Sequence, residues 1–278
     1  MFLLAGAVVL IPVNWGLEAF KWKLSIAHLQ YVSFKNSFRA VLSGLSFSVT
    51  IPNRIGEYLG RIFYLQHGQR LKAVSATIIS SFSQLLITLI AGIAGLLLIK
   101  NLMVGVLMSA LVFRFIIYGL TGTTLVLLLL YFNIAGSAGL FKRWIKNQKY
   151  IYLVDALAYF NYSLLVKMLI ISLIRYIVFL IQYFLVFHFF EVNLSAIIIS
   201  EAMSVVFLFM AIVPSIALIE IGLRGEACIK IIGLFSGNAL GISLTSVTIW
   251  LLNLILPAIA GSLFLLNLKV FKRNNEII

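Results

Sequence analysis

The chain has 278 residues, of which 63% are hydrophobic and 10% are charged. Soluble domains contain about 45–50% apolar and about 25% charged residues, so this composition excludes a water-soluble globular protein. The 21 Lys and Arg residues against 8 Asp and Glu give a formal net charge of +13. We assign this excess to cytoplasmic loops and anionic lipid headgroups rather than to nucleic acid. The single cysteine, Cys228, excludes an intramolecular disulfide.

Long apolar runs predict helices that cross a bilayer, because about 30 Å of hydrocarbon requires about 20 residues at 1.5 Å per residue. Five runs have this length, near residues 2–20, 74–99, 102–132, 164–190 and 240–268. The first run lacks the basic start of a signal peptide, so we predict that it is retained. Two further apolar regions, about 37–69 and 195–236, are interrupted by proline, glycine and charged residues.

The distribution of basic residues indicates how the two interrupted regions are oriented. Basic clusters lie at residues 21–39, 70–72, 142–149 and 269–273. The positive-inside rule places all four clusters on the cytoplasmic side. Each interrupted region then begins and ends on the same side of the membrane, and the two regions form hairpins of opposite sense. They are either re-entrant loops or pairs of short crossings, which gives six to eight membrane segments.

Two broken elements of opposite orientation are typical of inverted-repeat transporters. We therefore predict an all-α, polytopic integral membrane protein with one transmembrane domain and two halves. Two unrelated Pro-kinked helices are the alternative. The predicted parts are the whole domain 1–278, a first half 1–132 with a re-entrant hairpin at about 37–69, a basic cytoplasmic loop 133–150, and a second half 151–278 with a re-entrant hairpin at about 195–236.

The first interruption runs from Pro52 to Arg61. Proline removes a backbone donor and glycine permits tight turns, so the helix is predicted to break here. Arg54, Glu57 and Arg61 are spaced by three and four residues and share one face if the chain resumes as a helix. We interpret all three as candidate substrate-binding residues, because guanidinium groups bind phosphate bidentately and a carboxylate balances them.

The second interruption repeats these ingredients, beginning at Pro214. Glu220 and Arg224 have the spacing of an ion pair within a helix. Glu220, Arg224 and Glu226 are further candidate substrate-binding residues, because an ionisable group inside a membrane segment costs about 2.5–3.5 kcal/mol. The structural alternative is that the charges of both interruptions only neutralise one another and hold the hairpins together.

Weaker candidates lie on the long predicted helices. Gln84 and Asn253 each belong to a polar stripe at helical spacing, and Arg175 lies within an apolar run. These three residues are candidates for lining a pathway, although hydrogen bonding between helices is the commoner use of such residues. Trp15 and Trp22 are predicted to anchor the first helix among the headgroups. The three histidines are scattered, so neither a metal site nor a cofactor is expected.

The two interruptions also carry a family resemblance. The Pro-x-x-x-Gly-Glu break at 52–57 and the Glu-x-Gly-x-Arg-Gly-Glu run at 220–226 resemble the lysylphosphatidylglycerol synthase transmembrane region. This is the flippase-like domain of bacterial multiple peptide resistance factors and their stand-alone relatives. The resemblance covers nearly the whole chain. It implies an integral protein of the bacterial inner membrane with two inverted halves and re-entrant helices, which moves a phospholipid or lipid-linked molecule between leaflets.

On that resemblance, the positions expected to bind substrate are Arg54, Glu57, Arg61, Glu220, Arg224 and Glu226. The sequence departs from longer relatives in two ways. It contains no soluble aminoacyl-transferase domain, so synthesis of lysylphosphatidylglycerol is not expected of it. It also begins inside what resembles the second crossing of longer relatives, so an upstream helix is expected to be missing.

The sequence therefore predicts a translocase rather than an enzyme. A headgroup phosphate would be bound by arginines while the acyl chains stay in the bilayer. No phosphate-binding loop for a nucleotide is present, so a gradient of lipid, protons or ions would drive transport, with Glu57, Glu220 or Glu226 as titrating groups. The alternatives are a membrane scaffold or accessory subunit of an envelope lipid-synthesis system, and a membrane-embedded transferase.

The expected partners follow from this interpretation. They are a membrane phospholipid or lipid-linked substrate, anionic lipid headgroups, and either a second copy of the chain or a separate lipid-modifying enzyme. No nucleic acid partner is expected.

Overall fold

The computed structural model describes residues 1–49, 51, 55–136, 156–214 and 217–266. Within these ranges the chain is helical apart from short connections, and it forms no β-strand. The predicted all-α, polytopic membrane architecture is confirmed. Residues 137–150 of the predicted cytoplasmic loop lie outside the described residues.

Among the described residues, five helical elements are long and apolar enough to cross a membrane. They are α1 (Phe2–Ile26), α4 (Arg70–Leu98), α6 (Ala110–Phe132), α9 (Tyr162–Phe189) and the element Ala239–Leu266. The last element joins α12 (Ala239–Trp250) and α13 (Leu256–Leu266) through a π-helical turn, Leu251–Ile255. All five predicted crossings are therefore present. The third begins later than predicted, because the short helix α5 (Lys100–Met103) and a turn precede it.

Polar side chains at the N-termini set where several helices begin. Ser109 caps α6 and Asn161 caps α9, and each side-chain oxygen accepts a hydrogen bond from the backbone N–H three residues later. Ser195 does the same for helix α10 (Ala196–Ile212). Such caps satisfy donors that would otherwise lack a partner at the start of a helix.

Short helices flank the two sequence interruptions. Helices α2 (Phe34–Ser48) and α3 (Ile55–Ile62) flank the first, and α10 and α11 (Ala217–Ile232) flank the second. Helix α3 is about 12 Å long and the other three about 22–26 Å at 1.5 Å per residue, which is less than the roughly 30 Å of hydrocarbon. The re-entrant orientation of the two hairpins and the inverted repeat stay predictions.

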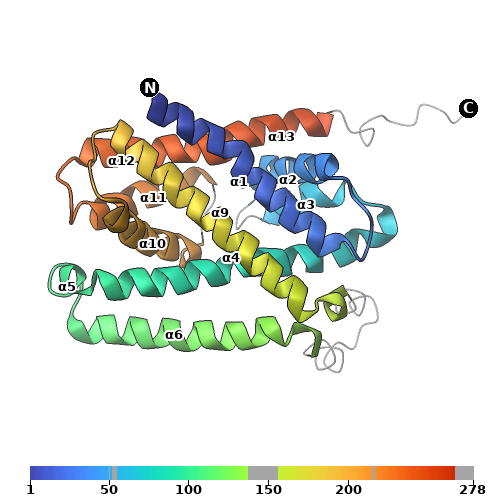
Figure 1. Cartoon of the computed structure of the whole chain (residues 1–278), viewed down its shortest axis with the longest axis horizontal. Coiled ribbons are helices and arrows are strands. Elements are labelled where there is room, and N and C mark those ends of the chain that lie inside the picture. The colour runs from blue at the N-terminus through green and yellow to red at the C-terminus, as the bar shows by residue number, and fades with distance from the viewer. Residues whose placement is uncertain (50, 52–54, 137–155, 215–216, 267–278) are drawn as a thin grey trace, which may run out of the picture.

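Helices α1 and α9 run side by side through the middle of the molecule and pack against each other (Figure 1). The α2–α3 hairpin lies on one side of this pair and the α10–α11 hairpin on the other. Helix α4 contacts α1, α9 and α10, and α6 packs along the outer side of α4. The two hairpins are therefore brought to opposite sides of a shared centre.

Glycines allow helices to approach closely at two interfaces. A Cβ atom at Gly92 or Gly95 of α4 would lie within 3.0 Å of atoms of α10. Gly56 and Gly60 of α3 lie against the backbone of α2, where a Cβ atom would clash with Phe47 and Gly44 respectively. Small residues permit such contacts between membrane helices, which then associate through van der Waals packing.

Candidate functional site

A cavity of about 670 Å³ lies where the two hairpins meet the long helices. Its walls come from α1, α4, α9 and the π-helical turn, and from the ends of α2, α3, α10 and α11 that adjoin the interruptions. This volume is within the range of about 300–1,000 Å³ that is typical of ligand sites. The charged side chains that line it are Glu18, Lys21, Glu57, Arg175, Glu220 and Arg224.

The remaining lining is largely apolar and aromatic, with Trp15, Phe179 and Phe207 among its members. Part of the cavity wall lies at the surface of the protein. Ile78 of α4 and Ile212 of α10 both line the cavity, yet they are 48% and 56% exposed. Apolar side chains therefore stand where the wall meets the surface.

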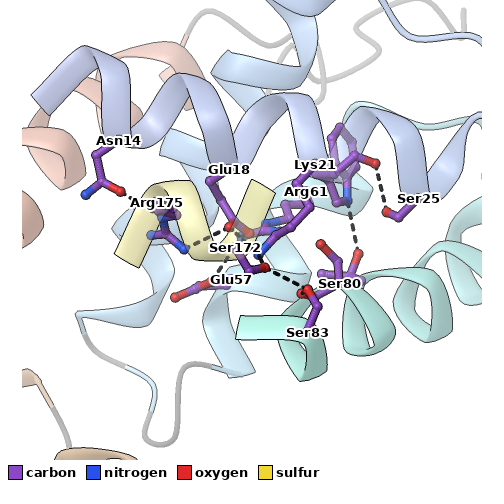
Figure 2. A network of polar contacts seen from close by, with 12 residues as sticks. Asn14, Glu18, Lys21, Ser25, Glu57, Arg61, Ser80, Ser83, Ser172 and Arg175 are labelled. Atoms are coloured by element: carbon purple, nitrogen blue, oxygen red, sulfur yellow. Dashed lines mark hydrogen bonds and ion pairs between the residues drawn. The ribbon is translucent and has the colours of Figure 1, made fainter. Parts of the chain in front are cut away.

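Glu18 of α1 is the centre of a buried charge network (Figure 2). Its Oε2 atom accepts a hydrogen bond from Arg175 Nη1 at 2.8 Å and lies 3.1 Å from Lys21 Nζ. Its Oε1 atom accepts from Arg61 Nη2 at 3.0 Å. The side chains of Glu18, Lys21 and Arg61 are all at most 4% exposed. One carboxylate therefore binds cations from three helices, α1, α3 and α9.

Glu57 and Arg61 form the predicted ion pair along α3. Arg61 Nη2 donates to Glu57 Oε2 at 3.0 Å as well as to Glu18. Glu57 lines the cavity, whereas Arg61 lies behind it and, among the described residues, is linked to it through these two carboxylates. The Nε and Nη1 atoms of Arg61 are buried and have no hydrogen-bond partner among the described residues.

A chain of polar contacts links this network to the last crossing. Arg175 Nε donates to Asn14 Oδ1 at 2.8 Å, and Asn14 Nδ2 donates to Asn253 Oδ1 at 3.0 Å. Asn253 belongs to the π-helical turn, and such turns are frequent at functional sites. The Arg175 guanidinium also lies over the ring of Trp15, 5.0 Å from its centroid, which is a cation–π contact.

The second hairpin supplies a separate ion pair to the same cavity. Arg224 Nη2 donates to Glu220 Oε1 within α11, as the spacing of four residues predicts. Arg224 Nη1 donates to the hydroxyl of Tyr183 on α9 at 3.0 Å. Both α11 side chains are nearly buried, at 11% exposed for Glu220 and 13% for Arg224. The two interruptions therefore each present a carboxylate and a guanidinium at or beside one cavity.

The six residues predicted to bind substrate are not all placed there. Glu57, Glu220 and Arg224 line the cavity, and Arg61 contacts it through Glu57. Glu226 faces away, with its Oε1 atom 3.1 Å from Lys230 Nζ and both side chains more than 60% exposed. Its distance from the other charges follows from helical geometry, because residues 220 and 226 do not share a face of α11. Arg54 lies outside the described residues.

The weaker sequence candidates all line the cavity. Gln84 on α4, Arg175 on α9 and Asn253 in the π-helical turn each contribute to its wall. The side-chain oxygen of Gln84 is buried and lacks a hydrogen-bond partner among the described residues. Whether any of the three binds a substrate stays a prediction.

Sequence reasoning missed the centre of the site. It did not single out Glu18, and it assigned Lys21 to a basic cluster at the membrane surface. The prediction that Trp15 and Trp22 anchor headgroups was wrong, because they are 5% and 0% exposed. Trp22 Nε1 instead donates to Thr77 Oγ1 at 3.0 Å within the protein. The available signal was Glu18 three residues before Lys21 at the end of an apolar run, which is the spacing of an ion pair on a helix.

Comparison with known proteins gives one match. The family model described as Lysylphosphatidylglycerol synthase TM region matches residues 1–261. Neither a curated protein nor a solved structure matches the chain. The matched region includes both hairpins and every cavity residue named above.

Proposed function

The chain belongs to the lysylphosphatidylglycerol synthase TM region family, and from this premise we propose that it is a flippase-like translocase. It is an integral, multi-pass membrane protein. In this proposal it resides in the bacterial inner membrane and moves a phospholipid or a lipid-linked molecule from one leaflet to the other.

One observation carries the proposal: both broken hairpins contribute charged side chains to the same cavity. Charged groups within membrane segments are costly, and those that face a cavity mark substrate or ion pathways. Transporters also place substrates at broken helices, because irregular backbone at membrane depth is tolerated where it lines a cavity. A cavity of about 670 Å³ accommodates a polar headgroup.

The headgroup phosphate would be bound by arginine side chains. Arg175 and Arg224 line the cavity from two different helices, and Arg61, outside the cavity lining, forms an ion pair with Glu57. A guanidinium presents a planar fork of donors that matches phosphate oxygens. The carboxylates paired with these arginines neutralise them when the cavity holds no headgroup.

The acyl chains would stay in the bilayer. The cavity wall at Ile78 and Ile212 is apolar and lies at the surface, so in this proposal a headgroup enters there while its acyl chains remain beside α4 and α10. Release to the other leaflet would require the hairpins to rearrange around the bound headgroup. Alternating movement of this kind around a fixed site is how inverted-repeat transporters operate.

The site suits binding better than catalysis. A general base must be able to lie within hydrogen-bond reach of the proton that it removes. The carboxylates that line the cavity are instead bound to cations: Glu18 contacts three cations, Glu57 contacts Arg61 and Glu220 contacts Arg224. We therefore propose a translocating role without a chemical step.

A scaffold or accessory subunit in envelope lipid synthesis is the second candidate. The observation that favours it is that the Glu18 network joins α1, α3 and α9 entirely within the protein. Such a network would hold a non-transporting protein together equally well. A scaffold predicts that Arg224→Gln, which leaves the Glu18 network intact, preserves function.

Lipid scrambling in proteoliposomes tests the proposal. The full chain is reconstituted with fluorescent phosphatidylglycerol or phosphatidylethanolamine, and the rate at which each probe changes leaflet is measured. Arg224→Gln is expected to slow transport about 10- to 100-fold, because a hydrogen bond to a charged group is worth about 1.5–3 kcal/mol. Glu226→Gln, on the same helix but outside the cavity, is the matched control and should transport at the normal rate.

If the folded and inserted protein transports neither fluorescent lipid, the result would count against a phospholipid translocase and favour the scaffold. Equal transport by the intact chain and Arg224→Gln would show that the second hairpin does not form the pathway.

A further inference from the structure

The last crossing is not one uninterrupted α-helix. Its two halves, α12 and α13, are joined by the π-helical turn Leu251–Ile255, in which the backbone N–H of Leu256 donates to the carbonyl oxygen of Leu251, five residues earlier. Such turns are among the few causes of sharp bends in helices, and they are frequent at functional sites. The turn forms part of the cavity wall, because Asn253 and Leu254 line the cavity.

A proline weakens the helix directly after this turn. Pro257 is the second residue of α13 and has no backbone N–H, so the carbonyl oxygen of Asn253 cannot receive an α-helical hydrogen bond from that position. The side chain of Asn253 bonds within the same crossing, where its Nδ2 atom donates to the carbonyl oxygen of Ile249 at 3.3 Å. A π-helical turn and a proline therefore both soften the backbone of the last crossing beside the cavity.

The half of the crossing after the turn is fixed to the first hairpin. Helix α13 packs against α2, and a Cβ atom at Gly261 of α13 would clash with the carbonyl oxygen of Leu42 on α2. Ser46 Oγ of α2 also donates to the carbonyl oxygen of Ala258 on α13 at 2.6 Å. Because their backbones lie this close and are joined by a hydrogen bond, we expect α13 and α2 to move as one unit.

The half before the turn is fixed to other neighbours. Helix α12 packs against α9 and α11. Gly241 lies against the carbonyl oxygen of Phe190, directly after α9, and Asn238 Nδ2 donates to the same oxygen at 3.0 Å. Helix α12 thus lies on the side of the second hairpin and α13 on the side of the first (Figure 1). A change in the angle between these two sides must bend the last crossing, and its backbone is weakest at the turn.

Two side-chain hydrogen bonds connect the turn to a cation of the cavity. Asn14 Nδ2 donates to Asn253 Oδ1 at 3.0 Å, and Arg175 Nε donates to Asn14 Oδ1 at 2.8 Å. Arg175 is one of the residues proposed above to bind the headgroup phosphate. When Arg175 changes position to meet a headgroup, Asn14 must follow it or lose this bond. One side chain therefore links occupancy of the cavity to the turn.

We propose that the Leu251–Ile255 turn is a hinge, at which α12 with α11 changes its angle to α13 with α2 during transport. This inference rests on the proposed function. A hinge requires a few residues that absorb a change in backbone angles between parts that keep their own packing. The last crossing has close packing on either side of the turn and a softened backbone within it. Bending there reshapes the cavity, because Asn253 and Leu254 belong to both.

A purely structural role of the turn is the alternative. In that case the π-helical turn and Pro257 would only fit the last crossing around α1, at one fixed angle. The two roles differ in the range of angles between α12 and α13 that the protein adopts. They also differ in whether the stiffness of the turn affects the rate of transport.

Distances between pairs of spin labels measure the range of angles without any transported lipid. Labels at Leu244→Cys and Ile259→Cys span the turn, and both positions are exposed. Labels at Leu111→Cys and Val126→Cys, also exposed, have the same separation of 15 residues along α6 and are the matched control. The native Cys228 is replaced by alanine in both proteins. With the full chain in detergent, we expect a broader distance distribution across the turn than along α6.

Pro257→Ala stiffens the turn by restoring a backbone N–H. This variant should narrow the distance distribution and slow the scrambling of fluorescent phosphatidylglycerol about 2- to 10-fold, because a restored hydrogen bond must break when the turn bends. Its midpoint of thermal unfolding should hold or rise, since proline is unfavourable inside a helix. Pro12→Ala replaces the proline inside α1 and, as the matched control, should transport at the normal rate.

A distribution across the turn as narrow as that along α6 would overturn the inference. A normal scrambling rate in folded Pro257→Ala would also overturn it, while leaving the proposed translocase standing. If the intact chain transports neither fluorescent lipid, the proposed function fails, and the two label pairs then decide separately whether the turn bends. If Pro257→Ala does not fold, the same two label pairs in the chain that keeps Pro257 test the hinge.

Discussion

The two hairpins share the same sequence ingredients, but their surroundings differ. In the first, Gly56 and Gly60 bring α3 against the backbone of α2, and Arg61 is 1% exposed and bound to Glu18 of another helix. In the second, Gly222 and Gly225 of α11 have open space where a side chain would stand. The Glu220–Arg224 pair lies within α11, and Arg224 also donates to the hydroxyl of Tyr183 on α9.

This difference teaches that a shared motif does not give a shared mechanical role. The first hairpin is fixed by close backbone packing and by a carboxylate that binds three cations. In the second hairpin, α10 is packed closely on Gly92 and Gly95 of α4, whereas the glycines of α11 leave space beside that helix. If one element of the two hairpins moves during transport, we expect it to be α11.

Removing the centre of the first hairpin's network should have the largest effect. Glu18→Gln leaves Lys21, Arg61 and Arg175 without their shared carboxylate. Breaking a buried ion pair costs about 3–5 kcal/mol, so we expect a large loss of folded protein. Thermal unfolding of the purified variant in detergent measures this. The equivalent change in the second hairpin, Glu220→Gln, should cost less, and an equal loss from both variants would contradict the comparison.

Glycine substitutions in α3 and α11 should change the stability of the protein by an intermediate amount, and in opposite directions. Gly60→Ala places a methyl group against the backbone of Gly44, and overpacking of this kind costs about 1–3 kcal/mol. Gly225→Ala meets open space, and alanine within a helix is more favourable than glycine by about 0.5–1 kcal/mol. The midpoint of thermal unfolding should therefore fall for the first variant and hold or rise for the second. Two decreases of similar size would indicate that α11 is packed as tightly as α3.

The smallest effect is expected from the contact between the second hairpin and α9. Tyr183→Phe removes the hydroxyl that accepts from Arg224 but keeps the aromatic ring. We expect a loss of about 1.5 kcal/mol in stability, at the lower end of the range for a hydrogen bond to a charged group, because Arg224 keeps its ion pair with Glu220. If this contact restrains α11, the variant should also change the rate of lipid scrambling. A scrambling rate identical to that of the intact chain would show that Tyr183 does not control the second hairpin.

Much of the fold follows from local features of the sequence. The five crossings were predicted because the thickness of the bilayer sets the length that an apolar run must have to cross it. The short helices at the interruptions were predicted because proline and glycine act on the backbone where they stand. The pairs Glu57–Arg61 and Glu220–Arg224 followed from a spacing of four residues on a helix.

The centre of the candidate site could not be predicted in the same way. Glu18 binds Arg61, which is 43 residues away, and Arg175, which is 157 residues away. These contacts depend on how α1, α3 and α9 pack together, and no local spacing encodes that packing. For the same reason, Trp15 and Trp22 resembled surface anchors, although neighbouring helices cover them.

The central claim is that a lipid headgroup crosses the membrane through the cavity shared by the two hairpins. The most direct test is the scrambling rate of fluorescent phosphatidylglycerol in liposomes that contain the intact chain, Arg224→Gln or Glu226→Gln. The account predicts transport well above that of protein-free liposomes for the intact chain and Glu226→Gln, and a loss of about 10- to 100-fold for Arg224→Gln. Equal rates for the two variants would contradict it.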